Sequence, residues 1–301
     1  MPKIRYVTKK IGRKRLAIIA KANEIIDEYS AQGFTLTLRA LYYKFVARDL
    51  IQNTQRNYAL LGDIINDGRL CGLIDWEAIE DRTRNMRAVP HWTSSREIMR
   101  SAAQSFAIDK WATQPFRVEV WIEKDALVGV VEGICAELDV PYFSCRGYTS
   151  QSEMWAGAMR LKSYLHNDQN TLILHLGDHD PSGKDMSRDI EERLDLFMGG
   201  TEFKRVALNM DQIEQYNPPP NPTKFTDSRA KPYIAEFGEH SWELDALEPR
   251  VIVNLIRAHV EAVRDEDRWL EAVEEEERHT DLLNKASARW SEVVDFLERG
   301  A

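Results

Sequence analysis

The sequence predicts an α/β protein: an N-terminal helical winged-helix domain, then a mostly parallel sheet covered by helices, then a helical acidic C-terminal extension. Residues 14–70 contain three stretches with the periodicity of amphipathic helices. Residues 116–209 alternate short apolar runs with helical stretches, an order that gives a parallel sheet between layers of helices. From Trp242 onward the pattern is helical and acidic. We therefore divide the chain into residues 1–100, 101–240 and 241–301.

Composition places the chain among folded proteins of a reducing compartment. Its 301 residues suffice for two domains, and 43% hydrophobic with 30% charged residues is an ordinary globular balance. The three cysteines form no CxxC pair, which argues against a disulfide framework or a thiolate zinc site. No apolar stretch approaches membrane-spanning length, and the basic N-terminus lacks the apolar region of a signal peptide. We expect a cytoplasmic, DNA-associated protein without a membrane partner.

The charge distribution predicts nucleic-acid binding despite a net charge of −9. Residues 1–21 carry eight Lys or Arg and no acid, whereas acids concentrate late, as in residues 264–278. A basic arm on an acidic chain is typical of contact with a phosphate backbone, and a solubilising tail is the alternative. The candidate DNA-binding residues of the arm are Lys9, Lys10, Arg13, Lys14 and Arg15.

The first domain has the element order of a DNA-binding module. Helical periodicity runs over residues 14–30, 35–50 and 53–70, and a short mixed stretch at residues 71–84 follows like a wing. Three helices followed by a wing predict a winged-helix variant of the helix-turn-helix. The third helix would enter a groove of double-stranded DNA with these residues leading: Asn53, Gln55, Arg56 and Asn57.

Acidic residues follow two strands of the predicted sheet. Glu123 ends the strand "FRVEVWIE", and Asp178 and Asp180 end the strand within "LILHLGDHDPSG". The carboxyl ends of parallel strands meet at one edge, so these three carboxylates should converge. Such a set suits Mg²⁺, or Mn²⁺, although an ion-pair cluster with Lys124 and Lys184 is the alternative. Strand alternation places His179 on the other face, so we expect the histidines of this strand to be core or supporting residues.

Two motifs resemble a known family. "VEVWIEKDAL", followed 55 positions after Glu123 by "GDHDPSG", resembles a Toprim domain, and the Asp-x-Asp-Pro-x-Gly form is similar to the A subunit of DNA topoisomerase VI and its meiotic double-strand-break relatives. The run Arg39-Ala40-Leu41-Tyr42-Tyr43 is similar to the Arg-x-x-[Tyr/Phe]-Tyr motif of that family's winged-helix domain. The chain departs from the family at Ala40, where an acid is usual, and in its acidic C-terminal helices, which have no counterpart there.

The resemblance implies a catalytic mechanism. Tyr43 would attack a backbone phosphate of DNA and form a 5′-phosphotyrosyl linkage, with Arg39, on the same helical face, binding the phosphate and stabilising the phenolate. Glu123 would act catalytically and would bind Mg²⁺ together with Asp178 and Asp180. The resemblance also implies a homodimer in which the tyrosine of one subunit faces the metal site of the other.

Two other functions stay open. One is a metal-dependent Toprim nuclease that cuts with water and forms no covalent intermediate, like the cleaving subunit of Wadjet plasmid-defence systems. The other is a non-catalytic DNA-binding regulator that uses the fold as a scaffold. The chain contains no P-loop, so strand passage driven by ATP would require a separate ATPase subunit.

Overall fold

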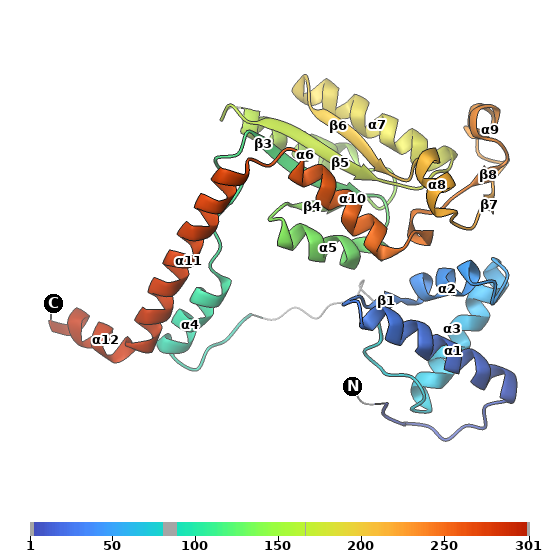
Figure 1. Cartoon of the computed structure of the whole chain (residues 1–301), viewed down its shortest axis with the longest axis horizontal. Coiled ribbons are helices and arrows are strands. Elements are labelled where there is room, and N and C mark those ends of the chain that lie inside the picture. The colour runs from blue at the N-terminus through green and yellow to red at the C-terminus, as the bar shows by residue number, and fades with distance from the viewer. Residues whose placement is uncertain (1–2, 81–88, 166, 300–301) are drawn as a thin grey trace.

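The computed structural model describes residues 3–80, 89–165 and 167–299. Three parts are visible in Figure 1: an N-terminal helical unit, an α/β unit built on one parallel sheet, and an arm of helices that extends away from the sheet. Within the described residues, none of the helices combines the length and the apolar character needed to cross a membrane.

The N-terminal unit packs three helices around its own core. Thr37 and Thr54 cap the second and third helices by accepting hydrogen bonds from the amides of Ala40 and Asn57. The elements are α1 (Arg13–Ser30), β1 (Leu36–Thr37), α2 (Leu38–Ala47), α3 (Gln55–Leu70) and β2 (Ile79–Glu80). Strands β1 and β2 pair in parallel. The wing that we predicted at residues 71–84 falls in part on residues 81–84, which lie outside the described residues.

The α/β unit contains a four-stranded parallel sheet, which confirms that part of the prediction. The strands are β3 (Phe116–Ile122), β4 (Tyr142–Ser144), β5 (Asn170–Leu176) and β6 (Glu202–Ala207). They lie in the order β4-β3-β5-β6, with every neighbouring pair parallel. The register aligns Ile122 with Leu176, so β3 and β5 end side by side. Whatever follows these two strands therefore meets at one edge of the sheet.

Helices cover both faces of this sheet (Figure 1). The covering elements are η1 (Asp125–Leu127), α5 (Val128–Glu137), α6 (Gln151–Leu165), α7 (Pro181–Met198) and α10 (Pro249–Glu261). Because strand side chains alternate, Val120 and Leu174 share a core with α5 and α10, whereas Trp121 and Ile173 share one with α6 and α7. Helix α10 follows the boundary predicted at residue 240, so residues on both sides of that boundary share one core.

A compact segment after β6 approaches the N-terminal unit. It contains α8 (Met210–Tyr216), β7 (Asn221–Pro222), α9 (Ala230–Phe237), β8 (His240–Ser241) and η2 (Leu244–Ala246). The proline-rich run at residues 217–222 forms no helix, as its composition predicts, and only its last two residues pair, in antiparallel fashion, with β8. Helix α2 contacts η2, so this segment joins the two units.

The helical arm was predicted in part: its helices after residue 241 were expected, whereas the helix at residues 95–105 was not. Helix α4 (Ser95–Ser105) lies along α11 (Glu266–Ala288), and α12 (Trp290–Arg299) ends the arm (Figure 1). The sequence shows no strong core pattern over residues 85–115, and we expected a connector there. The helix forms because Ser94 caps it by accepting from the Glu97 amide and Arg96 donates to the Ser287 carbonyl at 3.1 Å.

Candidate active site

Glu123 and Asp178 meet at the edge where β3 and β5 end. The Glu123 amide donates to the Leu176 carbonyl at 2.9 Å, which extends the strand pairing by one residue. The Asp178 amide then donates to Glu123 Oε2 at 2.9 Å. These two predicted residues therefore lie together because the strands that carry them are neighbours in the sheet.

Two glycines permit this close approach. A Cβ at Gly177 would lie 2.8 Å from Glu123 Oε2, and a Cβ at Gly183 would lie 2.3 Å from the Asp178 carbonyl oxygen. Both distances are below what side chains tolerate, so neither position accepts a larger residue without displacing the site. The close approach of Glu123 to the loop around Asp178 therefore depends on the two glycines of "GDHDPSG".

Asp180 begins helix α7. It is the N-cap residue, its Oδ1 accepts a hydrogen bond from the Gly183 amide at 2.6 Å, and Pro181 occupies the first turn. Strand β5 ends at Leu176, so the aspartates follow the strand rather than continue its alternation. Asp178 is buried, whereas Asp180 borders an open cleft.

A lysine lies among the acids of this edge. Lys124 Nζ lies 2.9 Å from Asp178 Oδ2 and 3.3 Å from Asp245 Oδ1, and it also pairs with Glu243. The other oxygen of Asp178 accepts from the Leu244 amide at 2.8 Å. In this arrangement no group of three or more His, Cys, Asp or Glu side chains in residues 3–80, 89–165 and 167–299 is placed to hold a metal ion.

Burial dominates the electrostatics of the two carboxylates. It raises the pKa of Asp178 to about 8, with Lys124 opposing the shift and Glu123 adding to it. Burial also raises the pKa of Glu123, and the hydrogen bond from the Asp178 amide opposes that rise. Full ionisation of both carboxyl groups is therefore disfavoured even with the Lys124 ammonium beside Asp178.

Arg39 and Tyr43 contact each other one turn apart on α2. Arg39 Nη2 donates to the Tyr43 hydroxyl at 3.4 Å, and its guanidinium pairs with Glu243 and Asp245, each at 3.1 Å. We expected Arg39 to favour the phenolate. Burial, followed by the charges of Asp245 and Glu243, instead raises the pKa of Tyr43 to about 12, and Arg39 only opposes this. The expected net activation is thus absent in this arrangement.

One cleft brings the two sets of residues together. It has a volume of about 740 Å³ and lies between the N-terminal and α/β units. Arg39 and Tyr43 border it from α2, and Asp180 borders it from the start of α7. Glu243, which precedes η2, borders the same cleft and pairs with Arg39. The candidate nucleophile Tyr43 and the candidate metal ligand Asp180, which were predicted from distant motifs, therefore border one cleft.

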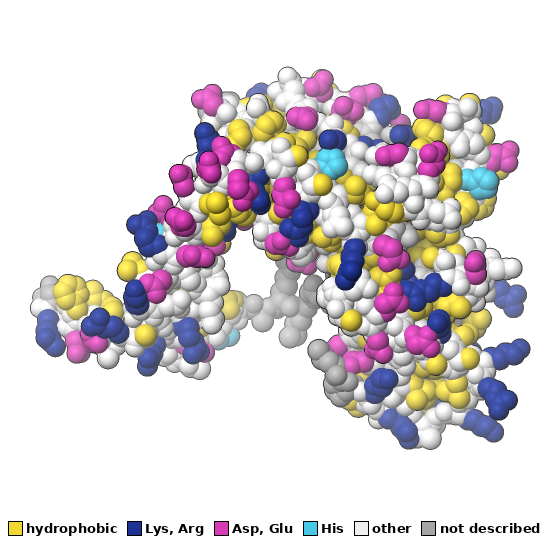
Figure 2. Space-filling view, viewed as in Figure 1, with side chains coloured by type: hydrophobic (Ala, Val, Ile, Leu, Met, Phe, Trp, Pro, Cys, Tyr) yellow, Lys and Arg dark blue, Asp and Glu magenta, His cyan; other side chains and the backbone are white. Residues whose placement is uncertain are grey.

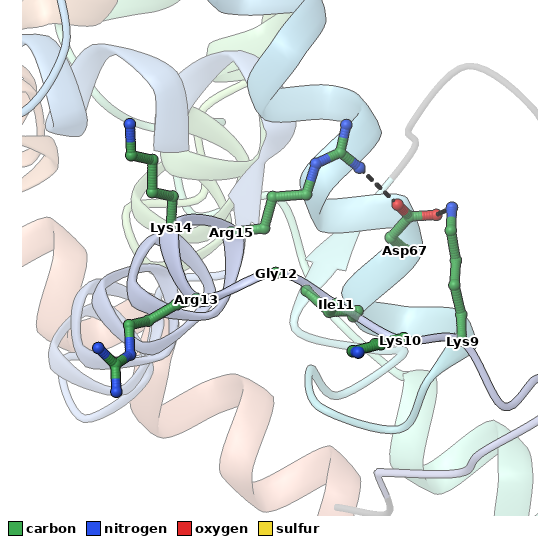
Figure 3. A pocket seen from close by; sticks show the side chains of 8 residues that line it. All are labelled: Lys9, Lys10, Ile11, Gly12, Arg13, Lys14, Arg15 and Asp67. Atoms are coloured by element: carbon green, nitrogen blue, oxygen red, sulfur yellow. Dashed lines mark hydrogen bonds and ion pairs between the residues drawn. The ribbon is translucent and has the colours of Figure 1, made fainter.

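The predicted basic arm lies against the N-terminal unit. The Tyr6 and Val7 amides donate to the Leu70 carbonyl at 2.9 and 3.0 Å. Lys9 and Arg15 both pair with Asp67 of α3 at 2.7 Å, as Figure 3 shows. Their charges are therefore partly compensated within the protein.

Three other basic residues of the arm remain directed outward. Figure 3 shows the side chains of Lys10, Arg13 and Lys14 around a shallow hollow, pointing away from Asp67. We call this the basic hollow; Lys9, Arg15 and Asp67 also line it. All three are exposed. Lys and Arg side chains are also prominent along the outer edge of this unit in Figure 2. This surface has the positive charge that a phosphate backbone requires.

The other DNA-binding candidates lie at the opposite end of α3. Gln55 and Arg56 form its first turn, where Gln55 borders the cleft and Arg56 is exposed. Asn53, just before the helix, hydrogen-bonds Asn221 of the α/β unit. The rise of a helix places Gln55 about 18 Å from Asp67 along the axis. The amino end of α3 therefore faces the cleft rather than the basic hollow.

The sequence analysis missed three charged residues of the site: Arg205, Glu243 and Asp245. It named Lys124 only as a cation of the alternative ion-pair cluster, and Lys124 does pair with Asp178. Arg205 donates to the carbonyl oxygens of Gly177 and Gly183 at 2.9 and 3.1 Å, which fixes the loop between β5 and α7. The sequence did offer a signal for Arg205, because it is a charged residue within a predicted strand and is followed by the apolar run Val-Ala-Leu. For the acids, the signal was that Glu243-Leu244-Asp245 repeats the acid-x-acid spacing of Asp178-His179-Asp180.

The two histidines near the aspartates lie in the core. His175 is fully buried, with Nδ1 3.1 Å from the Ser187 hydroxyl. His179 is also buried, with Nδ1 2.8 Å from the Tyr233 hydroxyl. Both side chains contact core neighbours rather than the carboxylates, in line with the roles that strand alternation predicted.

A comparison of the chain with models of protein families and with curated proteins finds no match.

Proposed function

We propose that this protein cleaves DNA strands by tyrosine transesterification. The observation that supports the proposal is the shared cleft, which Tyr43 and Arg39 border from α2 and Asp180 borders from the start of α7. Glu123 and Asp178 do not line it; they contact each other just after the ends of β3 and β5. A nucleophile, a guanidinium and carboxylates around one open space are the groups that phosphoryl transfer to a protein side chain requires.

The reaction exchanges one phosphodiester for another. The Tyr43 oxygen forms a bond to a backbone phosphorus, and the bond from that phosphorus to the 3′-oxygen breaks. The phenol loses its proton, and the departing 3′-oxygen gains one, so no net oxidation or reduction takes place. Arg39 can donate to a phosphate oxygen and to the phenolic oxygen at once, because it already reaches the Tyr43 hydroxyl.

Mg²⁺ or Mn²⁺ would be held by Glu123, Asp178 and Asp180. Their oxygen chemistry fits a hard divalent cation, and among the described residues Glu123 and Asp180 each keep one carboxylate oxygen without a hydrogen bond. Asp178 would have to exchange Lys124 for the metal. When bound, the ion would neutralise charge on the phosphate that reacts.

We propose double-stranded DNA as the substrate and a homodimer as the working form, since cutting both strands needs two sites. The basic hollow supports the first part by supplying outward-directed charges next to α3. A separate ATPase subunit remains a prediction from the absence of a P-loop. The DNA-binding set is Lys9, Lys10, Arg13, Lys14, Arg15, Gln55 and Arg56.

Substitution of Tyr43 by Phe tests the proposal. It removes the nucleophilic oxygen, so we expect cleavage to fall below detection, while stability changes by less than about 1 kcal/mol because the ring remains. Wild-type reactions stopped with denaturant should leave protein covalently bound to 5′ ends, seen as DNA whose mobility is restored by protease. Tyr58→Phe, at another tyrosine of the cleft, is the matched control and should leave the covalent product intact.

The high pKa of Tyr43, about 12, favours a second candidate, a metal-dependent nuclease in which water attacks the phosphate. In that case Tyr43→Phe would remain active and the cut ends would carry no protein.

The ion pair between Lys124 and Asp178 favours a third candidate, a non-catalytic regulator, in which this pair would only stabilise the fold. DNA binding without cleavage in Mg²⁺ or Mn²⁺ would favour that function.

A further inference from the structure

A tight turn of the α/β unit lies beside the cleft. The Asp227 amide donates to the Lys224 carbonyl at 3.0 Å, so Phe225 and Thr226 form the tip of this turn. The turn lies between β7 and α9, at the right of Figure 1. Lys224 and Asp227 border the cleft, as does Asp180 of the same unit. The turn is therefore a neighbour of a candidate metal ligand.

Contacts on both sides hold the turn in place. Before it, the Thr223 amide donates to the Glu239 carbonyl at 2.9 Å, next to the pairing of β7 with β8. After it, Arg229 Nε lies 2.7 Å from Asp227 Oδ1, and Nη1 of the same guanidinium lies 3.2 Å from Asp185 Oδ2 on α7. The tip is thus presented from a fixed base, which reduces the entropy lost when a ligand binds there.

The cleft has a cation that the protein leaves unpaired. Arg39 and Lys224 are the Lys and Arg residues that border the cleft within the described chain. Arg39 is engaged by Glu243 and Asp245. Lys224, in contrast, is exposed and forms no ion pair with any described residue. Its ammonium is therefore available to a phosphate.

The residue next to this cation is an exposed aromatic. Phe225 is 68% exposed at the tip, where turns mostly carry Gly, Pro, Asn, Asp or Ser. A single exposed apolar side chain is ordinary on a protein surface. Here, however, the ring adjoins an unpaired lysine at the border of the cleft. A cation for the backbone and an aromatic ring for a base are the two contacts by which proteins hold strands with unstacked bases.

We infer that this turn binds DNA beside the phosphate that enters the cleft, with Lys224 on a backbone phosphate and Phe225 stacked on a base. The inference rests on the proposed function and specifies the form of its substrate. In a continuous duplex, neighbouring bases cover both faces of each base. A side chain can stack on a base only where the stack is open, as at a gap, a bubble or a kinked step. The preferred substrate is thus double-stranded DNA with locally unstacked bases.

Binding of gapped DNA tests the contact without relying on cleavage. Fluorescence anisotropy in EDTA compares a labelled duplex that contains a single-stranded gap with the same duplex without the gap. We expect wild type to prefer the gapped duplex. Phe225→Ala should weaken binding of the gapped duplex about tenfold and that of the continuous duplex by less than about twofold. Phe225→Trp keeps a stacking face and should bind as wild type does. Phe296→Ala, at a phenylalanine of the helical arm that is 77% exposed, is the matched control.

Two further measurements separate the roles of the two side chains. A fluorescent purine analogue placed beside the gap should change its emission when wild type binds, and much less when Phe225→Ala binds. Lys224→Gln should reduce the slope of log K against log salt on the continuous duplex by about 0.9, the contribution of one phosphate contact. Lys204→Gln, at an exposed lysine that does not border the cleft, should leave the slope unchanged.

Three results would overturn the inference: no preference of wild type for the gap, no effect of Phe225→Ala, or equal weakening of both DNAs by it. A smaller oligomer of Phe225→Ala with unchanged DNA binding would also overturn it, because the ring would then belong to a protein contact. A preference for gapped DNA that depends on Phe225, without a covalent product in Mg²⁺ or Mn²⁺, would support this contact and count against the proposed function alone.

Discussion

At the scale of single residues, Lys124 compensates the charge of the acids at the carboxylate edge, where Glu123 and Asp178 follow β3 and β5. Its ammonium contacts Asp178, Glu243 and Asp245, and only 13% of its side chain is exposed. A cation of the protein therefore compensates Asp178 before any metal is present. Metal binding at this edge must compete with that contact, since one carboxylate oxygen cannot serve both fully.

Removal of Lys124 should destabilise the metal-free protein and increase its stabilisation by a bound metal ion. In Lys124→Met the buried acids lose their cation, so we expect the metal-free protein to lose about 3–5 kcal/mol of stability. The rise in melting temperature on adding Mn²⁺ or Mg²⁺ should in turn exceed that of wild type. Thermal melts with and without metal measure both effects.

Two further variants serve as controls for that measurement. Lys184→Met removes a nearby cation that stacks on Phe237, and it should respond to metal as wild type does. Asp178→Asn should lose the response. If Lys124→Met and wild type were stabilised equally by metal, Lys124 would not compete for the ion, and the assignment of Asp178 as a ligand would fail.

Part of the site could be predicted because it depends on local rules. Glu123 and Asp178 follow neighbouring parallel strands, so strand order alone brings them to one edge. Glu243 and Asp245 could not be placed in the same way. They reach Lys124 and Arg39 across more than a hundred residues of chain, and their acid-x-acid spacing does not by itself indicate which cations they meet. Only the packing of η2 against α2 shows their role.

At the scale of elements, periodicity identified the sheet and its covering helices because their apolar faces are strong. Strand β5 is apolar on both faces, and α7 begins at a capping aspartate followed by proline. Helix α4 carries a narrow apolar stripe at helical spacing (Ile98, Met99, Ala102 and Ala103), but within the described chain it buries only Ala103. Its partner is α11, about 170 residues away in sequence, and such pairing leaves little trace in a short window of residues.

The contact between β5 and α7 predicts a pH dependence of stability. Burial lowers the pKa of His175 from 6.5 to about 3, and its Nε2 has no hydrogen-bond partner among the described residues. The unfolded chain binds a proton below pH 6.5, whereas the folded chain does so only near pH 3. Stability from this group is therefore complete above pH 6.5 and falls by up to about 1.4 kcal/mol per unit as the pH decreases toward 3.

Replacement of His175 by Phe isolates this effect. The variant should lose stability less steeply than wild type between pH 6.5 and 4.5, as measured by urea unfolding at a series of pH values. His91→Gln, at an exposed histidine, is the control and should keep the wild-type slope. Equal slopes in His175→Phe and wild type would show that His175 titrates normally in the folded protein.

At the scale of the whole molecule, α3 connects the basic hollow to the cleft. The hollow lies near Asp67, toward the carboxyl end of α3, and the cleft is bordered by Gln55 at its amino end. The two are about 18 Å apart along the helix, which corresponds to about five base pairs of DNA. Under the proposed function, we expect one duplex to contact the hollow with its backbone while a phosphate a short distance away enters the cleft.

The outward-directed residues of the hollow should account for the salt dependence of DNA binding. Neutralisation of Lys10, Arg13 and Lys14 to Gln should reduce the slope of log K against log salt by up to about 2.7, since each phosphate contact contributes about 0.9. Lys9 and Arg15 should contribute less, because Asp67 already compensates them. Fluorescence anisotropy with a duplex at several salt concentrations measures the slope.

The design of this experiment separates local contacts from overall charge. The matched control neutralises three exposed lysines elsewhere on the protein, Lys204, Lys231 and Lys285. It changes the net charge equally and should leave the slope within about one contact of wild type. The cleavage products formed at saturating DNA should be the same for both triple variants, because neither alters the cleft. If both variants reduced the slope equally, the hollow would contribute only general charge, and the path of DNA along α3 would have to be abandoned.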